Sequence, residues 1–214
     1  MIAAMVPPRE DPTPSDELDQ SLTQRLAKGA QRGEPGSFDE LYGRLAPALF
    51  AWASLRARSA LGGRVAAEDL VQEAWYRAHR AFPQFDAARV PFRRWLFRIA
   101  KNVLLEAIRK VPSLPLGPGA AGESTRVRLF DRPDEATSVT RRLARDEAVR
   151  DFQSYLKELP AEDQDLVLHL GIEGLTNAEA ARRLGISTDA ATKRWQRLRA
   201  HLRASRAAAR LLED

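Results

Sequence analysis

The side chains best suited to bind another molecule lie near the C-terminus, in the segment LTNAEAARRLGISTDAATKRWQRLRAHL (175–202). Thr176 and Glu179 fit a capping box at the start of one helix. Gly185 suits the left-handed turn that ends this helix, and Ser187 can cap a second helix, which is basic. A short basic helix that follows such a turn can enter the major groove of DNA. The segment therefore predicts a DNA-binding helix-turn-helix.

The second helix of this segment has separate apolar and polar faces. Ala191, Trp195, Leu198 and Leu202 share one face. The candidates for contacts with base edges are Asp189, Thr192, Lys193, Gln196 and Arg197, and those for phosphates are Arg194, Arg199 and Arg203. A helical hairpin with a solvated basic face is the alternative. The cap, the glycine and the basic face occur in the order of a helix-turn-helix, which favours DNA binding.

A second cationic segment lies between residues 89 and 110. It holds seven basic residues, Arg89, Arg93, Arg94, Arg98, Lys101, Arg109 and Lys110, against one acid, Glu106. Cations interleaved with aromatic rings are typical of single-strand binding, where bases stack on the rings. Phe82, Phe92 and Trp95 also fit a helix core. Taken alone, the pattern favours the core assignment.

The chain carries no set of residues that indicates catalysis. It has no cysteine and three histidines, so disulfides and cysteine-ligated metal sites are excluded, and neither a metal nor another cofactor is expected. Asp69, Gln72 and Glu73 form a polar cluster without a histidine or a pocket signal. They could be a solvated face, a docking surface for a basic partner or, least in keeping with the sequence, an acid–base pair.

Helical periodicity accounts for the segments that must position these residues. Helices are expected over 37–60, with a Ser37–Glu40 capping box and a kink or break at Pro47, over 66–82, and from Pro91 to about residue 110. Further helices are expected over 134–158 and 161–170, before the helix-turn-helix. No segment shows strand-like alternation. The expected fold class is all-α, with two small helical domains.

Composition divides the chain and indicates its environment. Residues 1–19 are expected to be a disordered tail, 20–111 one domain, 112–134 a flexible linker rich in proline and glycine, and 135–210 the other domain. A net charge of +5 favours a polyanionic partner. No apolar run approaches the roughly 20 residues of a membrane span, and the N-terminus does not resemble a signal peptide. A cytoplasmic protein without membrane insertion is expected.

Three blocks together resemble a known family. They are AEDLVQEAWYRAHRAFPQFD, FRRWLFRIAKNVLLEAIRK and LPAEDQDLVLHLGIEGLTNAEAARRLGISTDAATKRWQRLRAHLR. In this order and spacing they are similar to the extracytoplasmic function (ECF) group of the sigma-70 family of bacterial RNA polymerase sigma factors. The resemblance implies that residues 20–111 are sigma region 2 and residues 135–210 are region 4. It implies a factor that directs core polymerase to promoters and promotes DNA melting.

The resemblance also implies a role for particular positions. Contacts to the polymerase beta-prime subunit are expected from Asp69, Gln72 and Glu73. Contacts to the opened −10 element are expected from Phe85, Asp86, Arg89, Arg94, Arg98, Lys101 and Asn102, with Phe85, Asp86 and Arg89 in the loop that captures a flipped base. Contacts to the duplex −35 element are expected from Ser187, Thr188, Asp189, Thr192, Lys193, Arg194, Gln196 and Arg197. The run Ala190–Thr192 departs from the family's usual Thr-Val-Lys.

Two other classes of function compete with this interpretation. A regulator of the LuxR type has a similar C-terminal helix-turn-helix but would leave the blocks at 66–110 unexplained. An enzyme with a helical fold lacks a catalytic set. For a sigma factor, the expected partners are core RNA polymerase through its beta-prime and beta subunits, and promoter DNA. An anti-sigma factor is a further candidate, since many members of the group are inhibited in this way.

Overall fold

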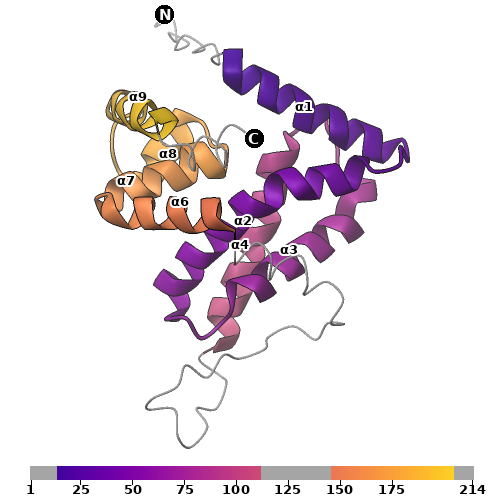
Figure 1. Ribbon diagram of the computed structural model, residues 1–214, viewed down its shortest axis with the longest axis horizontal. Coiled ribbons are helices and arrows are strands. Elements are labelled where there is room, and N and C mark those ends of the chain that lie inside the picture. The colour runs from indigo at the N-terminus through magenta and orange to yellow at the C-terminus, as the bar shows by residue number, and fades with distance from the viewer. Residues whose placement is uncertain (1–13, 112–145, 205–214) are drawn as a thin grey trace, which may run out of the picture.

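The computed structural model describes residues 14–111 and 146–204, and every regular element in these two ranges is helical (Figure 1). The expected all-α fold class is confirmed. Residues 14–111, here the N-terminal module, contain α1 (Pro14–Gln31), α2 (Ser37–Leu61), α3 (Ala67–Ala81), the 3₁₀ turn η1 (Phe82–Gln84) and α4 (Phe92–Lys110). The expected linker at 112–134 and residues 135–145 lie outside the described ranges.

The core of the N-terminal module forms where α2, α3 and α4 pack together. Trp52, Phe92 and Leu96 are at most 2% exposed. Of the kink or break expected at Pro47, the break was wrong, because α2 continues through the proline. Leu45, Ala46, Ala48 and Leu49 are buried on both sides of the proline, and this packing offsets the hydrogen bond that proline cannot make.

The start of α2 also differs from the expected capping box. Gly36 is the N-cap residue, with φ +81°, and no side chain caps the helix. Ser37 is buried inside the first turn rather than preceding it. A left-handed backbone at this position favours glycine, so the chain enters α2 through a turn that serine would not adopt readily.

Helix α1 is an element that sequence periodicity did not predict. It begins at Pro14, so residues 14–19 are helical and do not belong to the expected disordered tail. It packs on α2 and on α4 (Figure 1). Ala27 is fully buried in this contact, and Thr23 is 5% exposed. The N-terminal module is therefore a four-helix unit.

Residues 146–204, here the C-terminal module, contain α6 (Glu147–Glu158), α7 (Ala161–Leu166), the π-helical segment η4 (Val167–Ile172), α8 (Asn177–Leu184) and α9 (Thr188–Ala204). The expected helix-turn-helix is present as α8 and α9. Thr176 and Glu179 form the predicted capping box, and Gly185 has φ +67°. Ser187 Oγ accepts a hydrogen bond from Ala190 N at 3.1 Å, so the predicted second cap is also confirmed.

The two modules contact each other where α2 lies beside α6 and η4 (Figure 1). Glu173, which directly follows η4, is the centre of this contact and is 7% exposed. Its Oε1 accepts a hydrogen bond from Trp52 Nε1 at 2.9 Å, and its Oε2 lies 2.8 Å from Arg183 Nη1 and 3.2 Å from His169 Nδ1. Arg56 Nη1 pairs with Asp165 at 2.8 Å.

Glu173 remains ionised although it is buried. Burial raises the pKa of its carboxyl group. Hydrogen bonds from His169 and Trp52 and the charges of His169 and Arg56 lower this pKa by a larger amount, so that it falls to about 2. A buried carboxylate is tolerated when hydrogen-bonding partners satisfy its oxygens. The contact between the modules thus depends on a charged group that needs partners from both of them.

Candidate nucleic-acid interface

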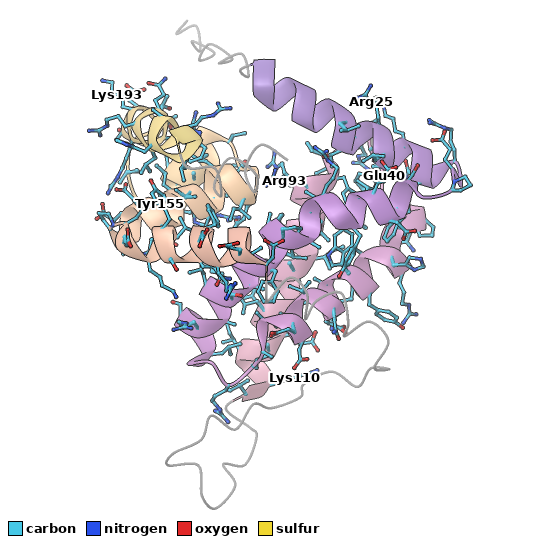
Figure 2. All side chains as sticks on the ribbon, viewed as in Figure 1. Arg25, Glu40, Arg93, Lys110, Tyr155 and Lys193 are labelled. Carbon is cyan, nitrogen blue, oxygen red and sulfur yellow. The ribbon has the colours of Figure 1, made fainter. Side chains whose placement is uncertain are left out.

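The outer face of α9 presents most of the side chains predicted to contact duplex DNA. Ser187, Thr188, Asp189, Lys193, Gln196 and Arg197 are all exposed. Lys193 extends from the end of the C-terminal module that lies far from α2, α3 and α4 (Figure 2). Ala191 and Leu198 are buried, as the apolar pattern predicted. The geometry matches a recognition helix, with its polar residues facing solvent and its apolar residues fixing its orientation.

Two of the predicted duplex contacts are engaged within the protein. Arg194 pairs with Glu162 at 2.5 Å and with Asp163, both in α7. The hydrogen bonds that Arg194 donates to Glu162 and Asp163 raise the pKa of its guanidinium. Thr192 Oγ1 donates to Thr188 O at 2.9 Å. Arg194 therefore ties α9 to α7, and a phosphate would have to compete with two acids for it.

One face of α4 is exposed and cationic. Arg98, Lys101, Asn102 and Arg109 are exposed at helical spacing, and Leu105, between them, is 40% exposed. On the other side of the helix Leu96, Val103 and Ala107 are fully buried. This division places the cations where they can bind a phosphate backbone, as the sequence predicted.

The N-terminal end of this cationic face is covered by the other module. Arg94 Nη2 lies 2.5 Å from Glu179 Oε1, in the capping box of α8. Arg93, which lies between the modules, donates from Nε to Ile172 O at 2.8 Å (Figure 2). The Thr176 hydrogen bonds and the Arg94 charge outweigh the burial of Glu179 and lower its pKa. Arg94 was predicted to contact −10 DNA, but here it bridges the two modules.

The loop between η1 and α4 divides its predicted residues between the core and solvent. Phe85 is 4% exposed and packs among Phe82, Phe92 and Trp95, with a centroid distance of 4.9 Å to Trp95. It was expected to contact a captured base, and its burial in this aromatic cluster argues against that role. Asp86 and Arg89 are exposed on the outer side of the loop. They are the members of the predicted set that can meet a base.

The polar cluster on α3 is likewise divided. Glu73 is 5% exposed, its Oε1 accepts from Arg77 Nε at 2.6 Å, and Arg77 also pairs with Glu106 of α4 at 2.7 Å. Burial opposes the charge on Arg77, but the hydrogen bonds that it donates to Glu73 and Glu106 raise the pKa of its guanidinium. Arg77 therefore joins α3 to α4, and Glu73, which is buried beside it, does not have the exposure expected of it. Asp69 and Gln72 are half-buried, and Tyr76, nearby on the same helix, is 43% exposed.

Within residues 14–111 and 146–204, none of the helices combines the length and the apolar character that crossing a bilayer requires.

Family models match both modules. Residues 41–111 match the model described as "Sigma-70 region 2", and residues 150–202 match "Sigma-70, region 4". The first range covers α3, the loop and α4, and the second covers the helix-turn-helix. The two exposed cationic surfaces described above thus belong to the two regions of one family.

Similar proteins agree with these matches. The chain is 32% identical to RNA polymerase sigma factor CnrH of Cupriavidus metallidurans over 88% of its length and 94% of that protein. It is 28% identical to RNA polymerase sigma factor NccH of Alcaligenes xylosoxydans xylosoxydans, over 87% and 95%, and 29% identical to ECF RNA polymerase sigma factor SigM of Mycobacterium tuberculosis, over 79% and 77%. The solved structure of CnrH in complex with the cytosolic domain of CnrY aligns with a TM-score of 0.38 at 29% identity, over 87% of this chain and 95% of that one. The chain therefore belongs to the extracytoplasmic function group of the sigma-70 family of RNA polymerase sigma factors.

Proposed function

We propose that this sigma factor divides promoter recognition between its modules, with α9 contacting duplex −35 DNA and the loop and α4 contacting opened −10 DNA. The observation that supports this most strongly is the pair of exposed polar and cationic surfaces, one on each module. Duplex DNA needs a helix that fits the major groove, whereas an unstacked base needs a pocket and neutralisation of its phosphates. Core polymerase performs the chemistry, and the factor supplies binding and orientation.

The proposal assigns the −10 contacts to Asp86, Arg89, Arg98, Lys101 and Asn102. These residues are exposed on the loop and on one face of α4. Arg94 can join them only after it leaves Glu179. Unstacking a base costs a few kcal/mol, which the loop and the cations of α4 must offset.

Run-off transcription with core polymerase tests the function as a whole. The factor should support initiation at promoters selected from a genomic library, and footprinting with permanganate should detect unpaired thymines at −10. A regulator of the LuxR type would bind promoter DNA without core polymerase and would not support initiation. That alternative leaves the match of region 2 unexplained.

For the polymerase contact we propose Asp69 and Gln72 of α3, together with the exposed Tyr76. The Arg80 guanidinium lies over the Tyr76 ring, and its Cζ is 5.6 Å from the ring centroid. The relative CnrH was solved in complex with the cytosolic domain of CnrY, and we propose that a partner protein binds this factor as well.

Asp69→Lys is expected to weaken binding to core polymerase at least ~10-fold, because charge reversal at an interface opposes association. Affinity is measured by titrating labelled core polymerase. Asp151→Lys, at an exposed position of α6, is the matched control and should bind as the wild type does. Equal affinities for the two variants would contradict the assignment of this surface to polymerase.

Lys193→Ala combined with Gln196→Ala is expected to change the preferred −35 sequence and leave core binding unchanged. Both side chains are exposed on α9, and each well-placed base contact contributes about 1–3 kcal/mol of discrimination. The readout is selection of −35 sequences from a randomised promoter library. Arg182→Ala, which is exposed on α8, serves as the control. An identical selected motif in the double variant would exclude these residues from sequence recognition.

A further inference from the structure

The loop between η1 and α4 is held in place by two glutamines of α1. Gln24 Nε2 donates to Ala87 O, and Gln31 Nε2 donates to Phe85 O. Gln24 Oε1 also accepts from Phe92 N at 3.1 Å, in the first turn of α4. One amide group thus bridges the loop and the start of the helix that follows it.

The loop is also ordered by hydrogen bonds within itself. Asp86 Oδ1 accepts from Ala88 N at 2.9 Å, and Asp86 O accepts from Arg89 N at 3.1 Å and from Val90 N at 3.3 Å. The Phe85 ring is buried beneath it. The glutamine amides and the buried Phe85 ring thus hold the loop from the protein side, while the side chains of Asp86 and Arg89 remain exposed.

The two glutamines are not what attaches α1 to the module. Ala27 and Thr23 are buried against the neighbouring helices, and Leu26 packs at the edge of the core. The side-chain amides reach from this helix to carbonyls 54 and 63 residues away along the chain. Their removal should leave α1 docked and release the loop.

We propose that Gln24 and Gln31 are positioning residues that preform the loop for capture of an unstacked base. This proposal rests on the proposed −10 function of the loop. A loop that is already ordered loses less conformational freedom when DNA binds, and affinity rises accordingly. The glutamines touch only the backbone, so they act through the placement of Asp86 and Arg89.

Hydrogen exchange of the full-length chain tests the positioning without DNA. Methionine has nearly the length of glutamine but forms no comparable hydrogen bonds, so Gln24→Met and Gln31→Met are the test variants. Amides of residues 85–92 should exchange ~5- to 10-fold faster, as loss of about one net hydrogen bond predicts. Amides of α2 should be unchanged. Gln24→Glu keeps the acceptor for Phe92 N but places a carboxylate oxygen against Ala87 O, so the loop amides should exchange at least as fast as in Gln24→Met.

Gln164→Met is the matched control, because Gln164 Nε2 also donates to a backbone carbonyl, Leu159 O at 2.9 Å, but in the other module. It should leave residues 85–92 unchanged. Unchanged exchange of the loop in both test variants would overturn the proposal. Faster exchange spread over α2, α3 and α4 would also overturn it, since that result indicates a general structural role.

Single-strand binding by the holoenzyme provides the functional readout. The probe is the tightest single strand that wild-type holoenzyme selects from a randomised pool. Gln24→Met should weaken binding of this single strand to the holoenzyme ~5- to 10-fold, while binding of duplex −35 DNA stays unchanged. Equal binding by wild type and variant would overturn the positioning role alone. Failure of wild-type holoenzyme to select any strand would overturn the −10 assignment of the loop, and the inference with it.

Discussion

Glutamine in place of Glu173 is expected to lower the free energy of unfolding by about 3 kcal/mol at neutral pH. The carboxyl group has a pKa of about 2 in the folded protein against an ordinary value of 4.5, and this difference corresponds to about 3 kcal/mol. Chemical denaturation of the full-length chain, followed by circular dichroism, measures the change. Glu158→Gln, at an exposed position of α6, is the control.

The pH dependence of this effect has a defined sign. The folded pKa of Glu173 is below the ordinary value, so its contribution is complete above about pH 4.5 and is lost as the pH falls toward 2. Replacement with glutamine should therefore flatten the acid limb of the stability profile, and the two proteins should converge near pH 2. Parallel profiles, or a loss no larger than that of Glu158→Gln, would contradict the central role of Glu173.

Alanine in place of Phe85 is expected to lower the free energy of unfolding by about 3–5 kcal/mol. Its ring is 4% exposed and lies 4.9 Å from the Trp95 centroid and 5.4 Å from the Phe92 centroid, so truncation would leave a cavity in an aromatic cluster. The same denaturation experiment measures it, and Phe85→Leu, which keeps most of the buried area, should lose much less.

This prediction separates a core role for Phe85 from a role in base capture. If Phe85→Ala had wild-type stability but lost single-strand binding, the ring would have to turn outward to meet DNA. If stability falls as expected, any loss of promoter opening follows from disorder of the loop above it.

The helix-turn-helix could be predicted closely because its signals are local. Thr176, Glu179, Gly185 and Ser187 each satisfy a backbone requirement set by residues within three or four positions. Such local requirements can be recognised in a single sequence. The apolar periodicity of α3 and α4 predicted their buried faces for the same reason.

The residues that were misplaced depend on how elements pack together and on the backbone conformation of their neighbours. Glu73 pairs with Arg77, which reaches Glu106 on another helix, and the aromatic rings around Phe85 come from η1 and α4. Ser37 failed as a cap because Gly36 took a left-handed conformation next to it. Helical periodicity places a polar residue on a face but does not show which faces will meet.

Helix α1 illustrates the same limit. Its glutamines resemble any solvated polar residues, and only the fold brings them to the loop carbonyls. A sequence signal for such contacts would require knowledge of which residues vary together among related proteins.

Under the proposed −10 function, the ion pair between Arg94 and Glu179 would couple promoter binding to the arrangement of the modules. DNA that takes up Arg94 must displace Glu179, which keeps its bonds to Thr176 and so can release the arginine without losing its cap. Linkage then acts in both directions. Packing of the modules lowers the apparent affinity for −10 DNA in proportion to the fraction of molecules in which Arg94 is free. Bound DNA, in turn, favours separated modules to the same extent. Higher salt weakens both phosphate contacts and exposed ion pairs. The measured salt dependence of promoter binding should therefore be smaller than the number of cations on α4 implies.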